Sequence, residues 1–311
     1  MKTLKHIIVA GTLGLAGIGS ASANTFASAI LDINNFRLLH SNGAVYRNTD
    51  FTRMVNVNDA HATASLNSVF VNASGSGIRP DVAHQCVGAC GSMTTENNFA
   101  MNGSLFASQG SFGFADQSFT GSGISINGAA AGSHSQTRAD VATMQNNQYA
   151  TGNSSVGSSN TMAFTLGGSD TMTVSFDATP YSMAYITPGS HPVTSAAARI
   201  SWSINIVDLT TGVSVFNFAP PEINGRASVS RTHGLPGMSD YNAGGSAFHF
   251  ARMTPQLLAG RNYQVTILHN TLVTALQQEE VPEPASLSIF GAGLLGMMLV
   301  RRRRHGISVV A

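Results

Sequence analysis

Strict alternation of apolar and polar residues over a long central stretch is the feature that most constrains this fold. In the segment 200–206, isoleucines and Trp202 occupy every second position, and polar residues fill all the positions between them. The segments 162–166 and 172–176 repeat that period of two. Because side chains alternate between the two faces of a strand, such runs indicate half-buried antiparallel strands. The chain is therefore predicted to be all-β, with an antiparallel β-sandwich of jelly-roll or immunoglobulin-like type.

Short turn-forming segments join these runs. Residues 167–170, with the sequence Gly-Gly-Ser-Asp, predict a hairpin-like connection between the first two runs. Residues 210–212, with the sequence Thr-Thr-Gly, predict a turn into a further strand over 213–218. The side chains expected in the core are Met162, Phe164, Leu166, Met172, Val174, Phe176, Ile200, Trp202, Ile204 and Ile206.

One tyrosine near the end of the chain gives a clue to the architecture. Tyr263 opens an alternating run with Val265 and Ile267, directly after a corner that contains Gly260. This arrangement resembles the tyrosine corner of β-sandwiches, in which the hydroxyl bonds to the backbone a few residues upstream. We therefore expect Tyr263 to face the core and its hydroxyl to bond to the preceding segment.

The first half of the chain is less regular. Residues 27–39 predict a first strand. Residues 100–160 are rich in Gly, Ser and Asn, with phenylalanines spaced among them. We expect short strands and long loops of the same sandwich there, and the alternative is a self-associating segment of a matrix protein. Residues 137–149 predict a short helix.

Charge is scarce, because Asp, Glu, Lys and Arg make up only 10% of the chain. Residues 24–281 hold ten arginines and fourteen acidic residues, a formal charge of −4. The segment also contains no stripe of basic residues of the kind that binds a phosphate backbone, so we expect no nucleic acid partner. Lys2 and Lys5 are the only lysines. Schiff-base chemistry, a Ser–Lys dyad and a P-loop lysine are therefore excluded beyond the N-terminus.

The N-terminus is typical of an export signal. Basic residues precede an apolar run over 7–18, and Ala21 and Ala23 form a small-x-small cleavage site. We expect a signal peptide over 1–23 and a mature chain that starts near Asn24. The alternative is an uncleaved N-terminal anchor, for which the apolar run is short.

The opposite end carries a short apolar segment followed by positive charge. Residues 285–300 are uncharged and mostly apolar, and four arginines follow at once: Arg301, Arg302, Arg303 and Arg304. As a helix the segment is about 24 Å long at ~1.5 Å per residue, against roughly 30 Å of hydrocarbon. The arginines would hold that end in the cytoplasm. The sequence therefore predicts a transmembrane helix with a basic cytoplasmic tail.

A proline-rich tripeptide, Pro282, Glu283 and Pro284, precedes the apolar segment. Proline disfavours helix at the residue before it and has no N–H donor, so the tripeptide is expected to be extended. Together with the helix and the arginine cluster, the tripeptide resembles the PEP-CTERM sorting signal of Gram-negative bacteria. The resemblance covers residues 281–304. Residues 305–311 depart from the family pattern, which usually ends soon after the arginines.

This resemblance implies a processing partner, exosortase, a membrane-embedded cysteine transpeptidase-like enzyme that acts near the Pro-Glu-Pro motif. It also implies transient insertion into the inner membrane, followed by transfer to the cell surface or extracellular matrix of a bacterium that often makes extracellular polysaccharide. A plain C-terminal anchor is the alternative. The expected organisation is a signal peptide (1–23), a β-sandwich ectodomain (24–278), a linker (279–284), a transmembrane helix (285–300) and a basic tail (301–311).

Two cysteines, Cys86 and Cys90, are separated by three residues. In an oxidising compartment they most simply pair with each other, and we predict a local disulfide worth roughly 2 kcal/mol. His84 lies nearby, but two cysteines and one histidine lack a fourth ligand and the spacing of a zinc site. The CxxxC spacing without a βαβ pattern also disfavours redox catalysis. We therefore expect neither a metal nor a cofactor.

Catalytic motifs are absent from the sequence. The chain contains neither a GxSxG elbow nor an HExxH motif. A glycosidase needs two carboxylates in one cleft, and outside the C-terminal linker the only glutamates are Glu96 and Glu222. The segment 240–244 imitates the start of a calcium loop, but Ala251 stands where the bidentate glutamate should fall. A turn is the expected structure there.

These observations predict an exported, non-catalytic surface or extracellular-matrix protein that is associated with biofilm or exopolysaccharide. Two alternatives stay open. One is a carbohydrate-binding adhesion module, although one tryptophan and six tyrosines leave few stacking platforms. The other is a secreted hydrolase with an unrecognised carboxylate pair.

Overall fold

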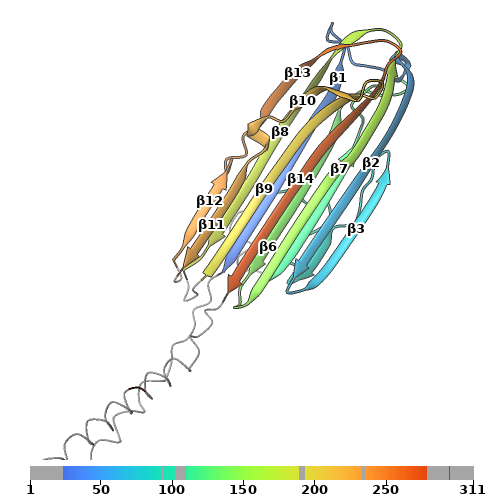
Figure 1. Ribbon diagram of the computed structural model, residues 1–311. Coiled ribbons are helices and arrows are strands. Elements are labelled where there is room, and N and C mark those ends of the chain that lie inside the picture. The colour runs from blue at the N-terminus through green and yellow to red at the C-terminus, as the bar shows by residue number, and fades with distance from the viewer. Residues whose placement is uncertain are drawn as a thin grey trace, which may run out of the picture. The chain divides into compact units, whose positions relative to one another are not determined.

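The alternating runs form the strands of two antiparallel sheets (Figure 1). The computed structural model describes residues 24–92, 94–101, 110–188, 193–232, 235–278 and 294, with only the backbone described for residues 157–161 and 232. The predicted all-β, antiparallel class is confirmed. The choice between a jelly-roll and an immunoglobulin-like type stays a prediction.

Each sheet has seven strands. Sheet I has the order β12 (Gly237–Tyr241), β8 (Asp170–Ile186), β1 (Thr25–Leu39), β6 (Ser133–Thr143), β5 (Phe112–Thr120) and β4 (Gln85–Gly88), with β13 (Phe248–Leu257) also paired to β8. Sheet II has the order β10 (Val213–Phe218), β9 (Val193–Asp208), β14 (Asn262–Gln278), β7 (Gln148–Leu166), β2 (Phe51–Leu66) and β3 (Val69–Gly77), with β11 (Arg226–Thr232) also paired to β9. Short 3-10 helices, η1 (Asn48–Asp50) and η3 (Pro221–Ile223), lie in the connections.

The two sheets pack face to face and enclose the main hydrophobic core. Strands β8 and β1 lie against β9, and strands β6 and β5 lie against β7. Of the ten side chains expected in the core, nine are buried there, and Met162 packs against them partly buried. Alternation along the sequence therefore identified the inward faces of β7, β8 and β9.

The connection at residues 167–170 crosses from one sheet to the other, so the predicted hairpin-like connection is wrong. Strand β7 pairs with β14 and β2 in sheet II, whereas β8 pairs with β1, β12 and β13 in sheet I. Both strands bury alternate residues in the same core from opposite sides, so alternation alone does not distinguish a hairpin from a crossing. The predicted turn at 210–212 does join two paired strands, β9 and β10.

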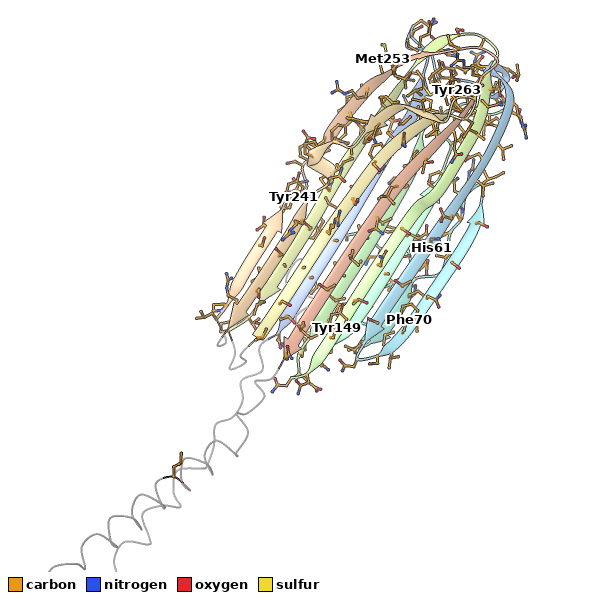
Figure 2. The ribbon with its side chains drawn as sticks, viewed as in Figure 1. His61, Phe70, Tyr149, Tyr241, Met253 and Tyr263 are labelled. Carbon is orange, nitrogen blue, oxygen red and sulfur yellow. A yellow bond between two sulfur atoms is a disulfide. The ribbon has the colours of Figure 1, made fainter. Side chains whose placement is uncertain are left out.

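The predicted tyrosine corner is present. Tyr263 is 2% exposed, and its hydroxyl accepts a hydrogen bond of 2.7 Å from the backbone N–H of Leu258. Its ring stacks on Phe164 across the β14–β7 pair, with ring centroids 5.5 Å apart. Figure 2 shows Tyr263 near one end of sheet II and Tyr149 near the other.

Strands occupy most of the region 100–160 that the sequence assigned to short strands and long loops. Strand β7 alone has 19 residues. The helix expected over 137–149 is wrong, because its first part belongs to β6 and its last residues to β7. Strand β6 is buried on both faces, with Val141 between the sheets and Ala142 in a second cluster on the outer face of sheet I. A strand without a solvent face lacks the polar alternation that marks strands in a sequence.

Residues 94–101, called here the covering segment, bury the outer face of sheet I. The backbone N–H of Asn97 donates to Asp116 at 2.6 Å, and Arg138 donates to the backbone carbonyl of Asn98. Phe99 packs against the second hydrophobic cluster, whose buried members are Phe26, Ile30, Phe112, Phe114, Ala142, Tyr181 and Met183. The outer face of sheet I is therefore a second core over β1, β5, β6 and β8.

Side-chain size differs between the two ends of the main core. Where β1 begins and β14 ends, the inward residues are mostly alanines and none is aromatic: alongside Val141, Ile186 and Val273 they include Ala27, Ala29, Ala139, Ala150, Ala196, Ala198 and Ala275. At the opposite end the core holds aromatic rings: Phe36, Tyr46, Phe51, Phe164, Phe176, Trp202 and Tyr263. We call these the narrow end and the wide end, because the sheets approach closely only where side chains are small.

We expect Gly113→Ala to lower the free energy of unfolding by about 1–3 kcal/mol. At this narrow-end glycine an added Cβ would lie 2.5 Å from the carbonyl oxygen of Ser65 and 2.7 Å from that of Thr151, both in the facing sheet. Gly77→Ala in edge strand β3 is the control, since a Cβ there meets no atom within 4 Å, and it should change stability by less than about 0.5 kcal/mol. Urea denaturation measures both variants, and equal effects would contradict the close approach of the sheets.

Tyr263→Phe should cost about 0.5–1.5 kcal/mol, because it removes the hydrogen bond between the Tyr263 hydroxyl and the backbone N–H of Leu258. Tyr149→Phe is the matched control, since that ring is 46% exposed on the same sheet and should tolerate the loss of its hydroxyl. Thermal unfolding of the two variants compares them. A Tyr263→Phe protein as stable as the Tyr149→Phe protein would mean that the corner bond contributes nothing.

Candidate functional site

The residues singled out for export and sorting lie outside the described part of the chain. They are Ala21, Ala23, Pro282, Glu283, Pro284, Arg301, Arg302, Arg303 and Arg304. The predicted transmembrane segment 285–300 also lies outside it, apart from residue 294. In the described part of the chain, no helix combines the length and apolar character of a membrane span.

The predicted disulfide is present between Cys86 and Cys90, whose Cα atoms are 6.2 Å apart. Cys86 lies on β4, where it pairs with Phe114 of β5, and it packs against the second hydrophobic cluster. The bond closes the turn that follows β4. It therefore fixes the start of the connection that leads to the covering segment.

His84 binds the covering segment. Its backbone N–H donates to Glu96 at 2.8 Å, and its Nδ1 lies 2.5 Å from the same carboxylate oxygen. Across the described ranges, no group of three or more His, Cys, Asp or Glu residues is arranged to hold a metal ion.

Beneath the covering segment the fold gathers acidic groups that are distant in sequence. Burial and, to a smaller extent, the charge of Glu96 raise the pKa of Asp116 to about 7, although hydrogen bonds from the backbones of Asn97 and Gln117 oppose the rise. Burial and the charge of Glu96 also raise the pKa of Asp81. Asp116 is fully buried, and each of its oxygens accepts a backbone N–H, from Asn97 at 2.6 Å and from Gln117 at 2.8 Å. These bonds make Asp116 an anchor for the covering segment.

A buried ion pair lies beside Asp116. Arg138 and Asp140, two residues apart on β6, are both fully buried, and the Nε of Arg138 donates to Asp140 at 2.5 Å. Arg138 also lies over the ring of Phe114, 5.2 Å from its centroid. Removing one partner of such a pair destabilises the fold by more than the intact pair stabilises it, because a buried charge is then left uncompensated.

A third polar cluster closes the wide end. His40 lies between two carboxylates, with Nδ1 2.6 Å from Asp170 and Nε2 3.0 Å from Asp50, and Tyr46 donates to Asp170 at 2.9 Å. Burial acts to raise the pKa of Asp170, but hydrogen bonds from Ser41, His40 and Tyr46 outweigh it and lower the pKa to about 2. The ionisable groups of this cluster bind one another. The cluster thus ties the connection after β1 to the crossing between β7 and β8.

A fourth candidate site is a pocket of about 260 Å³ between the sheets, called here the inter-sheet pocket. Its walls come from β1, β5 and β6 of sheet I and from β2, β7, β9 and β14 of sheet II. Most of the lining is apolar, and it includes Ile33, Met54, Trp202 and Val265. A concave apolar site with a few polar groups is the usual form of a small-molecule site.

His269 forms the polar end of the inter-sheet pocket and joins the two sheets. From β14 it reaches three partners on sheet I: the hydroxyl of Ser135 at 2.9 Å, the hydroxyl of Thr137 at 3.0 Å and the carbonyl oxygen of Leu31 at 3.0 Å. A carbonyl only accepts, so Nε2 carries the proton and Nδ1 accepts from Ser135. Burial lowers the pKa of His269 to about 4, although the bond to Leu31 opposes the change. The imidazole is therefore neutral at pH 7.

Comparison with known protein families identifies the end of the chain. Residues 280–304 match the model of the PEP-CTERM protein-sorting motif. The chain carries a PEP-CTERM sorting tail. No curated protein and no solved structure matches the chain. The match confirms the sorting tail predicted from the sequence, and a PEP-CTERM tail indicates export and exosortase-dependent sorting to the surface in Gram-negative bacteria.

The PEP-CTERM tail and the two-sheet domain are adjacent along the chain. The last strand, β14, ends at Gln278, and the matched tail begins at residue 280. Sequence patterns located the tail but missed the polar groups of the domain. His269 continues the inward series of Tyr263, Val265 and Ile267, so a period-two count could have placed it in the core. Asp116 carries no comparable signal, because its surroundings come from distant segments.

We expect His269→Gln to alter the pH dependence of stability. The pKa of His269 is about 4 in the folded protein and 6.5 as its ordinary value, so the unfolded chain binds the proton more tightly. This group stabilises the fold fully above pH 6.5, and about 2–3 kcal/mol is lost as the pH falls through 4. The stability difference between the native protein and the variant should therefore shrink by that amount between pH 7 and pH 4, measured by urea denaturation.

His61→Gln is the control for that experiment, since the side chain of His61 is 43% exposed on sheet II. Asp116 titrates with the opposite sign, because its raised pKa gives stability that is present below pH 3.8 and lost as the pH rises through 7. Only differences between variants isolate His269. Parallel pH profiles for the native and His269→Gln proteins would contradict the assignment.

Proposed function

We propose that the protein is an exported, non-catalytic cell-surface or extracellular-matrix protein that exosortase processes at its PEP-CTERM tail. In this proposal the two-sheet domain is the part that stays outside the cell and acts there, in association with biofilm or exopolysaccharide. The tail directs the protein through transient insertion in the inner membrane.

The positions in the sequence at which the two-sheet domain begins and ends give the main support for the proposal. Strand β1 begins at Thr25, directly after the expected cleavage site, and β14 ends at Gln278, before the sorting motif. Both strand ends meet at the narrow end, because the hydroxyl of Thr143 bonds to that of Thr25, and the side chain of Gln277 donates to the carbonyl of Thr143 at 3.2 Å. Cutting at both expected positions would thus remove no described strand and leave the core intact.

The geometry of the acidic groups supports a non-catalytic role. Asp116 has the raised pKa of a potential general acid and lies near Glu96, which is the kind of pair that a hydrolase uses. Its carboxylate, however, is fully buried under the covering segment, and both oxygens are held by backbone N–H groups. A catalytic carboxylate needs access to substrate, so this geometry favours an anchoring role.

The positions of the aromatic rings weigh against the carbohydrate-binding alternative. Trp202 is 1% exposed in the core, so it offers no face to a sugar. Among the described residues, the aromatic rings with large exposure are Phe70 at 60% and Tyr149 at 46%, both on sheet II (Figure 2). Carbohydrate binding by stacking would have to rest on these two rings.

Intact-mass measurement of the exported protein tests the proposal. In a strain that makes exosortase we expect a chain that starts near Asn24 and lacks Arg301–Arg304. In a strain without exosortase the arginines should be retained. The mature protein found with its arginine tail intact in the presence of exosortase would overturn the proposal.

A pair of variants tests whether exosortase recognises the Pro-Glu-Pro tripeptide itself. Glu283→Gln lies within the Pro-Glu-Pro motif and should leave most of the tail uncut, whereas Glu279→Gln makes the same chemical change just outside the matched residues and should be processed normally. The cell-surface fraction of each variant, determined by immunoblot, gives the second readout. Equal processing of the two variants would show that exosortase does not depend on the motif's glutamate.

A further inference from the structure

The inter-sheet pocket is too large to be an ordinary packing defect. Protein cores contain few voids larger than a water molecule. An engineered apolar cavity of about 150 Å³ already binds benzene. The inter-sheet pocket encloses about 260 Å³, in a domain whose narrow end is packed so closely that Gly113 has no room for a Cβ. The open space is therefore confined to one part of the core.

The lining of the pocket carries no charge at neutral pH. No Asp, Glu, Lys or Arg contributes to it, and its one ionisable group, His269, has a pKa lowered to about 4 by burial. Transfer of an ion into such surroundings without a partner costs far more than transfer of a neutral molecule. The pocket thus selects against charged ligands.

Polar groups on the wall give the pocket a place for one hydrogen-bonding group. Some are already used, since Asn58 donates to the carbonyl of Ile78 at 2.6 Å and Ser135 bonds to His269. The side chains of Asn56 and Ser133, which also line the pocket, make no hydrogen bond to other described residues. Neither has a fully buried, unbonded polar atom, so both side chains are accessible to a hydroxyl or carbonyl group of a ligand in the pocket.

The pocket also has an access point. Ile78 belongs to its lining and is 64% exposed, so the lining reaches solvent there. The neighbouring Arg79 donates through Nε to the carbonyl of Gly121 at 3.2 Å. This bond ties the end of β3 to the connection between β5 and β6, beside Ser122 and Gly123 of the lining.

We propose that the inter-sheet pocket binds an uncharged, mainly hydrocarbon molecule with a single hydrogen-bonding group, such as a medium-chain alcohol. By proportion with the cavity that takes benzene, the ligand has about ten non-hydrogen atoms. Its hydrocarbon part lies against Trp202 and the aliphatic wall, and its polar group bonds to Asn56 or Ser133. This binding site is independent of the sorting tail.

The only tryptophan of the chain, Trp202, lines the pocket and reports on its contents directly. The probe is 8-bromo-1-octanol, whose bromine quenches tryptophan emission on contact, added to the purified full chain. We expect saturable quenching that 1-octanol reverses by competition. Octanoate, a carboxylate of similar length, should compete at least about tenfold more weakly, because its charge has no partner in the pocket.

Two substitutions on the same strand locate the binding site. Asn56→Phe places a ring in the pocket and should weaken the quenching by about tenfold or more. Val55→Phe adds a side chain of the same size at a position that is 47% exposed on the opposite face of β2, and it should quench like the native protein. Far-UV circular dichroism checks that both variants fold. If Asn56→Phe does not, Ile126→Phe fills the pocket from a connecting segment and takes its place.

Three results would overturn the proposal. The first is quenching that is absent or that rises linearly with probe concentration. The second is equal quenching in the pocket-filling variant and in Val55→Phe, which would place the probe elsewhere. The third is competition by octanoate as strong as that by 1-octanol, which would show that the site does not discriminate against charge.

Discussion

The spacing between the two sheets governs what this domain can hold. Side-chain size sets that spacing: alanines and glycines let the sheets approach at the narrow end, and a set of aromatic rings holds them apart at the wide end. The start of β1 and the end of β14 both lie at the narrow end, where Thr25, Thr143 and Gln277 are joined by hydrogen bonds. The inter-sheet pocket lies among larger side chains, lined by Phe36 and Trp202. The two ends of the domain therefore suit different tasks: one closes the fold at its termini, and the other provides internal volume.

Several buried polar groups stabilise the arrangement because they bond to partners on other elements. His269 reaches from sheet II to three groups of sheet I, and its neutral form is what makes the burial tolerable. On the outer face of sheet I, Asp116 and Arg138 hold the covering segment, while the disulfide fixes the turn where the connection to it begins. The free-energy cost of burying such polar groups is small when they are hydrogen-bonded and large when they are not. They specify which surfaces meet, in addition to the apolar contacts that drive the packing.

Much of the strand content was predictable, and the errors have definite physical causes. Alternation identified the inward faces of β8 and β9, and Tyr263 was placed correctly because its corner is a local feature. The prediction of a hairpin at 167–170 is wrong because a period of two shows that a strand has one buried face, but it does not show which of the two sheets the strand belongs to. The helix expected over 137–149 failed because β6 is buried on both faces. Of the candidate sites within the two-sheet domain, only the disulfide was predicted, since its two cysteines are close together in the sequence.

The sequence by itself determined the sorting tail, the disulfide, the all-β class and the inward faces of the central strands. Each of these depends on residues within a few positions of one another, so linear order suffices. Only the tertiary structure decided the sheet crossings, the anchoring of the covering segment by Asp116, the inter-sheet bonds of His269 and the pocket beside it. Those features join residues that lie well apart in the sequence: Asn97 and Asp116 are separated by 19 positions, and Leu31 and His269 by 238. Their formation depends on which strands become neighbours, a choice that local patterning leaves open because many pairings bury the same apolar faces.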